Sequence, residues 1–320
     1  MATATKPDPA APDQSTATSS WAQQLVRHRV PIVGVFLGVS IALAIAYGLP
    51  ERQYLWIWLT VAPALTCAHS PRPVARVIID WLPVLILLGG YDFIRGFATD
   101  LLPRVIIEPH LRFDEIVFGG TTPTVVLQDW LNADRNPHWY DYIVFLVYLS
   151  HFVVSPLFAV YLYLRDRPRF RRYAMVMLGV SLAGILTYFI IPAAPPWFAS
   201  ETGDLEPTVR ITRWVWNDLG ATGAEKVFSG DPELANPVAA LPSLHAAWPF
   251  ILLLFVWNRA RRGKWVALCY ITLMSFILVY GSEHYVSDIL LGWVYATVGF
   301  IVINKLIDRR DARQVSPAPT

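Results

Sequence analysis

The sequence predicts an all-α fold, a polytopic membrane helical bundle with about eight transmembrane helices. Hydrophobic residues make up 55% of the 320 residues and charged residues only 16%, and the mean hydropathy is +0.42. These values lie outside the range of ordinary soluble domains. The apolar residues also form runs long enough to cross a bilayer as helices. A net charge of +2 is too small to indicate a nucleic-acid partner, so the expected environment is the lipid bilayer.

Apolar segments mark the candidate spans. The second segment is short and contains Pro63, and the sixth is also short. Either can therefore be a tilted or partly buried helix rather than a complete span. The segments are 31–49, 54–68, 77–94, 141–164, 173–191, 244–258, 264–281 and 285–305.

The basic residues predict the orientation of these spans. Lys and Arg gather before the first span, in every second connection after it, and after the last span. The two long intervening connections are acidic: 95–140 holds four Lys or Arg against six Asp or Glu, and 192–243 holds three against seven. Because short cytoplasmic loops are enriched in Lys and Arg, we expect both termini in the cytoplasm and the long connections outside.

Two histidines stand at predicted outer ends of helices. His245 follows Pro242 and Ser243 at the start of the sixth span, and His284 precedes the eighth. Asp288 comes four residues after His284, so on a helix it lies on the same face and can accept a hydrogen bond from the ring. An imidazole oriented in this way can attack phosphorus, and a second imidazole opposite can protonate the departing oxygen. The pattern predicts a phosphoryl-transfer site.

Four further residues are predicted to bind the substrate. The Ser243 hydroxyl and the backbone at the start of the sixth helix can donate hydrogen bonds to phosphoryl oxygens. Arg95 lies at the same predicted depth as both histidines, although it can instead pair with Asp92 and extend to the interface. Asp92 and Tyr285 complete the predicted set.

Other interpretations of these polar residues stay open. Two imidazoles and a carboxylate can hold a catalytic metal, but the spacing of Asp288 suits a partner of His284 better. A histidine at a helix end can simply form a hydrogen bond, whereas two histidines and a carboxylate on one membrane face favour catalysis. Asp80, Asp141 and His151 are expected to form hydrogen bonds between helices.

The two histidine motifs resemble the signature of the type 2 phosphatidic acid phosphatase superfamily. That signature is Pro-Ser-x-His followed by a second His with Asp four residues later, and it is matched by Pro242, Ser243, His245, His284 and Asp288. The resemblance implies that His284 is the nucleophile, Asp288 its orienting partner and His245 the general acid. It also implies a core of six helices and a reaction that needs no cofactor and no metal.

The chain departs from the superfamily at its other phosphate-binding cations. The Lys expected upstream of Arg-Pro is Leu65 or Val160, and the Ser-Arg pair expected before the nucleophile is Ile277-Leu278. These departures resemble the branch that contains the inositol phosphorylceramide synthases of fungi and their bacterial relatives. Segments similar to that branch are 91–96, 192–197, 236–249 and 284–292, and the resemblance covers residues 75–305.

The predicted organisation has four parts. Residues 1–20 are rich in Ala, Thr, Pro and Ser and are expected to be a disordered tail, as is 309–320. Two additional N-terminal membrane helices occupy 21–74, and the catalytic membrane domain implied by the resemblance occupies 75–308.

The first functional hypothesis is a membrane-embedded lipid phosphotransferase. It moves a phosphoryl-linked head group, with phosphoinositol as the candidate, through a phosphohistidine at the extracytoplasmic face, and the long outer connections can form a lid against water. One alternative is a phosphatase acting on a membrane phospholipid or a polyprenyl phosphate; another is a transporter or scaffold whose histidines relay protons. The absence of an Asn-x-Ser/Thr sequence favours a bacterial plasma membrane. The sequence does not specify the oligomeric state.

Overall fold

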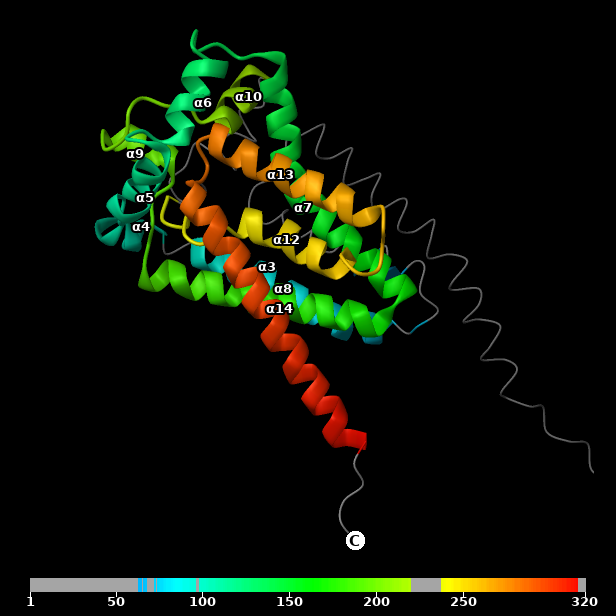
Figure 1. The fold of residues 1–320 in the computed structure, drawn as a ribbon. Helices are drawn as coiled ribbons and strands as arrows, with labels where there is room; N and C mark the ends of the chain where they lie inside the picture. The colour runs from blue at the N-terminus through cyan, green and yellow to red at the C-terminus, as the bar shows by residue number, and fades with distance from the viewer. Residues whose placement is uncertain are drawn as a thin grey trace, which may run out of the picture.

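The computed structural model describes residues 63, 64, 66, 67, 72, 74–95, 98–219 and 237–315. In these ranges the regular structure is helical, and the helices pack as a bundle (Figure 1). The predicted span at 31–49 lies outside the described residues, as does most of the predicted span at 54–68.

Each of the remaining six predicted spans corresponds to a described helix. The helices are α3 (Val74–Arg95), α7 (Trp139–Arg165), α8 (Arg167–Ile190), α12 (Leu244–Val256), α13 (Gly263–Tyr280) and α14 (Val286–Val315). Within the described residues, α7, α8, α13 and α14 are long and apolar enough to cross a membrane, and α12 is a shorter apolar helix. The predicted fold class, an all-α polytopic membrane bundle, is confirmed.

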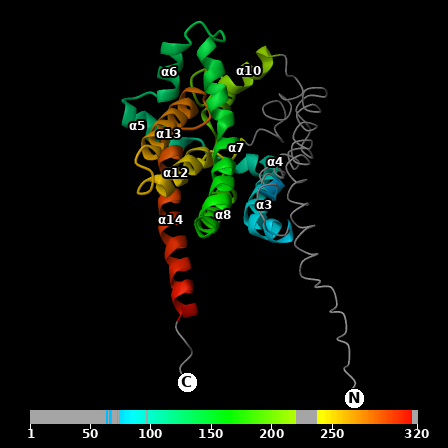
Figure 2. The ribbon, with the colours of Figure 1, turned by 90° about the vertical axis from the view of Figure 1, so that its right-hand side faces the viewer.

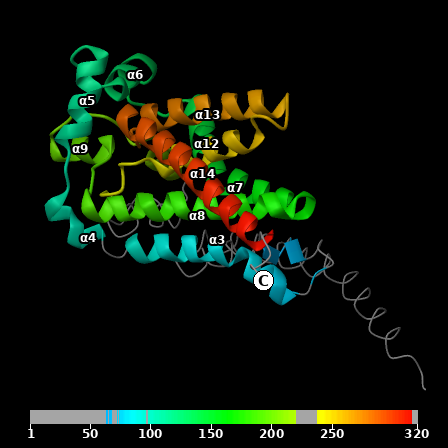
Figure 3. The same ribbon diagram turned by 60° about the horizontal axis from the view of Figure 1, so that its bottom comes forward.

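Helix α8 packs against α3, α7, α12 and α14. Figure 3 shows α3 and α8 side by side, with α14 crossing the bundle. Phe170 and Tyr173 of α8 belong to one buried hydrophobic cluster with Ile251 of α12 and Ala296 of α14. The opposite face of α8 exposes apolar side chains such as Leu186, as expected for a helix that also contacts lipid.

Short helices fill the two long connections. They are α4 (Ala98–Leu101), the 3₁₀ helix η1 (Leu102–Arg104), α5 (Glu108–Phe118), α6 (Pro123–Leu131), α9 (Pro196–Thr202) and α10 (Ile211–Asp218). Proline in the first turn starts α5, α6 and α9, because its fixed φ suits that position and its missing N–H is not needed there. In Figure 1 the short helices gather at the end of the bundle where α14 begins.

Ala193 joins three of the outer segments. It forms isolated parallel bridges with Ile106 and with Ala239. Its N–H donates to the carbonyl of Val238 at 3.0 Å, and its own carbonyl accepts from Ala240 at 3.0 Å. The chain that leads into α12 is therefore fixed to the ends of α8 and η1 before the first histidine motif begins.

Basic residues gather at the other end of the bundle. Arg169 of α8 donates to the carbonyl of Phe255 in α12, and Arg172 pairs with Asp308 of α14 at 2.6 Å. Figure 3 shows the α7–α8 and α12–α13 turns on the same side of the molecule, and Figure 2 shows the end of α14 extending beyond the other helices. The basic connections thus lie at one end of the bundle, and the two long acidic connections lie at the other.

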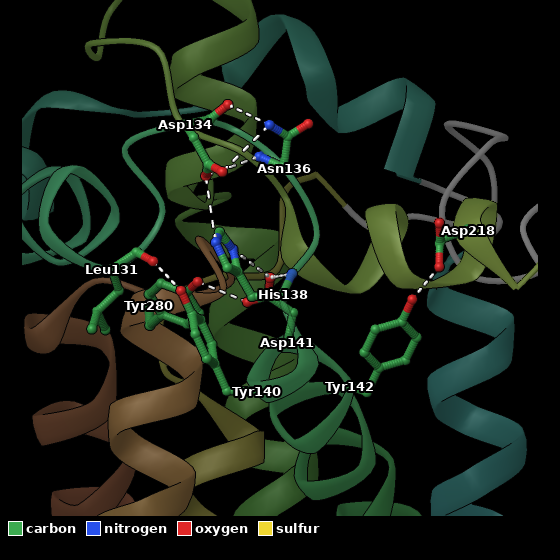
Figure 4. Close-up of polar contacts among 9 residues, drawn as sticks. All are labelled: Leu131, Asp134, Asn136, His138, Tyr140, Asp141, Tyr142, Asp218 and Tyr280. Carbon is green, nitrogen blue, oxygen red and sulfur yellow. Dashed lines mark hydrogen bonds and ion pairs between the residues drawn. The ribbon is translucent and has the colours of Figure 1, made fainter.

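Two aspartates join helices to one another. Asp80 of α3 accepts a hydrogen bond from the Tyr163 hydroxyl of α7 at 2.9 Å. Asp141, in the first turn of α7, accepts from the His138 N–H at 2.8 Å and from the Tyr280 hydroxyl of α13 at 2.7 Å. Figure 4 shows this second group. The predicted hydrogen bonds between helices are confirmed for both aspartates.

Candidate active site

His245 enters the site from the first turn of α12. Ser243 is the N-cap of this helix: its backbone is extended (φ −69°, ψ 109°), and its Oγ accepts a hydrogen bond from the Ala246 N–H at 3.2 Å. The N–H of Ser243 donates to the carbonyl of Asp288 at 3.0 Å, which ties α12 to α14. The Nε2 atom of His245 is buried and has no hydrogen-bond partner among the described residues.

His284 lies in the tight connection between α13 and α14. The N–H groups of Glu283 and His284 both donate to the carbonyl of Leu278, at 3.0 and 3.1 Å, so the turn continues directly from α13. Asp288 lies in the first turn of α14, where the helix dipole favours a carboxylate. Its Oδ2 accepts from the Tyr285 N–H at 3.0 Å and lies 3.5 Å from Nδ1 of His284. This second contact is at ion-pair distance and longer than a typical hydrogen bond.

The two histidine rings lie close together, with their centroids 5.7 Å apart. Helix α7 supplies aromatic neighbours to one of them. Tyr148 stacks on the His245 ring at a centroid distance of 4.9 Å, and the His151 ring lies 4.5 Å from it. Residues from α7, α12 and the start of α14 thus converge at one end of the bundle.

A buried ion pair adjoins His284. Arg210 donates from Nε and Nη2 to the two carboxylate oxygens of Glu283, at 2.9 and 3.0 Å, and the Thr212 hydroxyl donates to the same carboxylate at 2.6 Å. Burial acts to raise the pKa of Glu283, but the charge and hydrogen bonds of Arg210, with the bond from Thr212, lower it overall. The Arg210 guanidinium also lies over the Trp197 ring, 4.6 Å from its centre.

Gln128 of α6 holds the segment that carries this arginine. The side-chain nitrogen of Gln128 donates to the carbonyls of Val209 and Tyr280, at 2.7 and 2.8 Å, and its oxygen accepts from the Val209 N–H at 2.7 Å. Gln128 is fully buried. The backbone before Arg210 and the end of α13 are therefore fixed to one side chain.

Asp114 of α5 caps α14 from a neighbouring helix. Its carboxylate oxygens accept from the N–H groups of Val286 at 2.9 Å and Ser287 at 3.2 Å. Burial raises the pKa of Asp114 from its ordinary 3.8 to about 6, against the lowering effect of these two hydrogen bonds. An outer helix is thus joined directly to the helix that carries Asp288.

The structure brings part of the predicted site together. The residues that converge are Ser243, His245, His284 and Asp288. Tyr285 is adjacent, but its ring is fully buried and packs against the His110 ring at a centroid distance of 4.8 Å. Asp92 and Arg95 lie in the last turn of α3, where their side chains are outside the described part of the chain. Substrate binding by Tyr285, Asp92 and Arg95 stays a prediction.

Sequence reasoning missed Arg210, Glu283 and Asp114. Glu283 carried a signal, because it is an acidic residue directly before the predicted nucleophile and between two apolar helices. Arg210 and Asp114 lie in the long connections, where no motif places them. His151 was expected only to form a hydrogen bond between helices, whereas its ring lies 4.5 Å from the ring of the predicted catalytic residue His245.

The fold and the site define a class: a polytopic membrane protein with paired histidines and a helix-borne aspartate at one end of its bundle. Among the residues that the structure describes, no group of three or more His, Cys, Asp or Glu side chains is arranged to hold a metal ion. Residues 119–302 match the family model of the PAP2 superfamily. The chain belongs to the PAP2 superfamily.

Individual relatives place the chain in one branch of that superfamily. The phosphoinositol dihydroceramide synthase of Bacteroides thetaiotaomicron is 33% identical over 254 residues, which are 76% of this chain and 82% of that protein. The inositol phosphorylceramide synthase catalytic subunit of Schizosaccharomyces pombe and the inositol phosphorylceramide synthase of Candida albicans are 26% and 24% identical, over 84% and 79% of this chain. The chain spans 58% and 53% of the length of these two fungal proteins. No solved structure matches it.

These similarities confirm the resemblance to the inositol phosphorylceramide synthase branch. The chain is an integral membrane enzyme of the phosphotransferase or phosphatase type. The alternative of a transporter or scaffold finds no support in this family membership.

Proposed function

We propose that this enzyme transfers a phosphoryl-linked head group, with phosphoinositol as the candidate, from a membrane phospholipid to a hydroxyl group of a second lipid. The names of its relatives, which are synthases of inositol phosphorylceramide or phosphoinositol dihydroceramide, support transfer over hydrolysis. The main observation in support is that the centroids of the His245 and His284 rings are 5.7 Å apart and that Oδ2 of Asp288 lies 3.5 Å from Nδ1 of His284. Rings this close can contact one phosphoryl group.

In the first step, Nε2 of His284 attacks the phosphorus of the donor lipid. The nitrogen–phosphorus bond forms as the phosphorus–oxygen bond to the lipid alcohol breaks, and protonated His245 gives its proton to the departing oxygen. Asp288, beside Nδ1, holds the ring of His284 and stabilises its positive charge. The products are a free lipid alcohol and a phosphohistidine that carries the head group.

In the second step, the hydroxyl of the acceptor lipid gives its proton to His245 and its oxygen attacks phosphorus. The nitrogen–phosphorus bond then breaks, and His284 is regenerated. Water in place of the acceptor gives hydrolysis, so transfer requires that water be kept from the intermediate. The short helices at the histidine end are the proposed cover, and that end is proposed to be extracytoplasmic because the basic residues gather at the other end.

The test uses purified protein in lipid nanodiscs with phosphatidylinositol, labelled in the inositol ring, and a ceramide acceptor. Transfer produces a labelled lipid with a new phosphodiester, whereas hydrolysis releases the label into water. His284→Asn is expected to lower turnover at least about 10³-fold, with His138→Asn, a partly exposed histidine at the start of α7, as the matched control. Undiminished turnover by His284→Asn would exclude the phosphohistidine mechanism.

A further inference from the structure

The side chain of Arg210 is held rigidly and yet leaves one nitrogen unused. Arg210 lies at the N-cap of α10, and its side chain is 9% exposed. Glu283 binds Nε and Nη2, and the guanidinium carbon lies over the Trp197 ring. The remaining nitrogen, Nη1, is buried and has no hydrogen-bond partner among the described residues. Burying an unpaired charged donor is costly, so such an atom in a site points to an absent acceptor.

The unused nitrogen belongs to the same site as the histidines. Glu283, which holds the guanidinium, is the residue directly before His284, and the His284 ring lies 5.7 Å from the His245 ring between centroids. Nε2 of His245 is also buried without a partner among the described residues. One ligand with several acceptor oxygens can satisfy both atoms, and a phosphoryl group has this chemistry.

We propose that Nη1 of Arg210 binds a phosphoryl oxygen of the donor lipid and stabilises the negative charge that develops there during transfer. The proposal rests on the phosphoryl-transfer function proposed above and assigns the cation for which the sequence offered only Arg95. Glu283 and Trp197 fix the plane of the guanidinium, so Nη1 is positioned before the substrate arrives. The carboxylate of Glu283 also offsets the positive charge while the site is empty.

The neighbouring arginine is more exposed and has a different carboxylate partner. Arg213 lies one turn further along α10 and pairs with Glu201 at 2.7 Å, with side-chain exposures of 33% and 48%. An exposed pair of this kind contributes little to stability. Arg213 is therefore the matched control for substitutions of Arg210.

The decisive variant is Arg210→Lys. Its ammonium can still pair with Glu283, but it has no second nitrogen to present to a ligand. Orthovanadate, which mimics a phosphoryl group in transfer, is the probe: its inhibition constant is measured with labelled phosphatidylinositol in nanodiscs, beside thermal unfolding of the same samples. We expect Arg210→Lys to weaken vanadate inhibition about 10- to 100-fold, to slow turnover and to melt within a few degrees of the wild type. Arg213→Lys is expected to match the wild type in all three measurements.

Each outcome separates this proposal from the one on which it rests. If Arg210→Lys keeps wild-type vanadate inhibition, Arg210 does not bind the phosphoryl group, although the enzyme still transfers it. If the wild type neither turns over lipid nor binds vanadate, the proposed function itself fails. If Arg210→Lys does not fold, the double variant Arg210→Gln, Glu283→Gln, which removes both buried charges, replaces it; retained vanadate inhibition in that variant overturns the proposal.

Discussion

The carboxylate of Asp288 has two polar contacts at the start of α14, one a hydrogen bond and the other a longer contact. The Tyr285 N–H donates to Oδ2 at 3.0 Å, while Nδ1 of His284 lies 3.5 Å from the same oxygen. The first contact shapes the turn, and in the proposed mechanism the second orients the nucleophile. An asparagine can keep the first contact through its carbonyl oxygen, but its neutral side chain cannot stabilise a charged imidazole.

Asp288→Asn therefore separates catalysis from folding. We expect kcat to fall by about 10²- to 10⁴-fold with KM nearly unchanged, because the lost interaction is strongest when His284 carries positive charge. Steady-state transfer of labelled head group measures both constants, and thermal unfolding is expected to stay close to that of the wild type. A kcat within threefold of the wild type would show that Asp288 does not orient the nucleophile.

Asp114 makes stability depend on pH. Its folded pKa of about 6 lies above the ordinary 3.8 because burial outweighs its two backbone hydrogen bonds, and the nearby charge of Asp288 adds to the shift. Between these pH values the folded protein holds a proton that the unfolded chain has lost. The protonated Asp114 carboxyl therefore contributes to the free energy of unfolding. This contribution is fully present below about pH 3.8 and is lost as the pH rises through 6.

Asp114→Asn removes this dependence. Relative to the wild type, the melting temperature of the variant is expected to rise as the pH increases from 4 to 7, because only the wild type has to ionise a buried carboxyl. Differential scanning fluorimetry across that range measures the difference. Glu108→Gln, which changes an exposed carboxyl of the same helix, should show no such trend. If the difference in melting temperature between Asp114→Asn and the wild type does not change with pH, the prediction is wrong.

The residues of the site differ in how far the sequence could identify them. His245, His284 and Asp288 could be placed together because each lies beside an apolar run whose end has a predicted membrane depth. Arg210 could not, since its position depends on a contact with Glu283 that lies 73 residues away. Arg95 was favoured for its depth alone, and that criterion does not distinguish it from an arginine brought in by an outer connection.

At the scale of elements, α14 approaches the start of α12 through Gly292. A β-carbon at this position would lie 2.4 Å from the carbonyl oxygen of Ser243, whose backbone leads into His245. Gly179 makes a contact of the same length, but there the neighbour is the end of the Ile303 side chain. Backbone cannot move without moving the site, whereas a flexible side chain can rotate away.

Gly292→Ala is therefore expected to destabilise the protein by about 1–3 kcal/mol and to lower turnover, while Gly179→Ala changes both much less. The reason is that α14 must shift away from α12, which separates His284 from His245. Thermal unfolding in detergent and the labelled transfer assay measure the two effects. Equal behaviour of the two alanine variants would mean that the close approach at Gly292 does not position the site.

The elements were predictable to different degrees for a physical reason. The six described core helices follow long apolar runs, because lipid requires such runs, and the predicted ends lie within a few residues of α7, α12 and α13. The short helices α5, α6, α9 and α10 could not be predicted from apolar length. Their positions depend on buried polar contacts such as those of Gln128 and Asp114, which leave no periodic pattern in the sequence.

At the scale of the whole molecule, the two ends of the bundle differ in charge and in structure. One end carries the basic turns between α7 and α8 and between α12 and α13. At the other end α12 and α14 begin, close to the short helices (Figure 3), and His245 and His284 lie at these helix starts. A membrane potential and the insertion machinery both favour basic turns in the cytoplasm. The histidine end would then face away from the cytoplasm. The acceptor lipid would have to reach the site from that extracytoplasmic side.

Single cysteines test this orientation directly. In a background with Cys67→Ser and Cys269→Ser, we expect Glu206→Cys, an exposed position at the histidine end, to react with a membrane-impermeant maleimide in right-side-out vesicles. Arg261→Cys, an exposed position in the α12–α13 turn, should react only after the vesicles are opened. The difference arises because the reagent cannot cross the bilayer, so labelling reports the side of each residue. If only Arg261→Cys is labelled in sealed vesicles, the orientation is the opposite of the one expected. The lipid substrates would then have to come from the cytoplasmic leaflet.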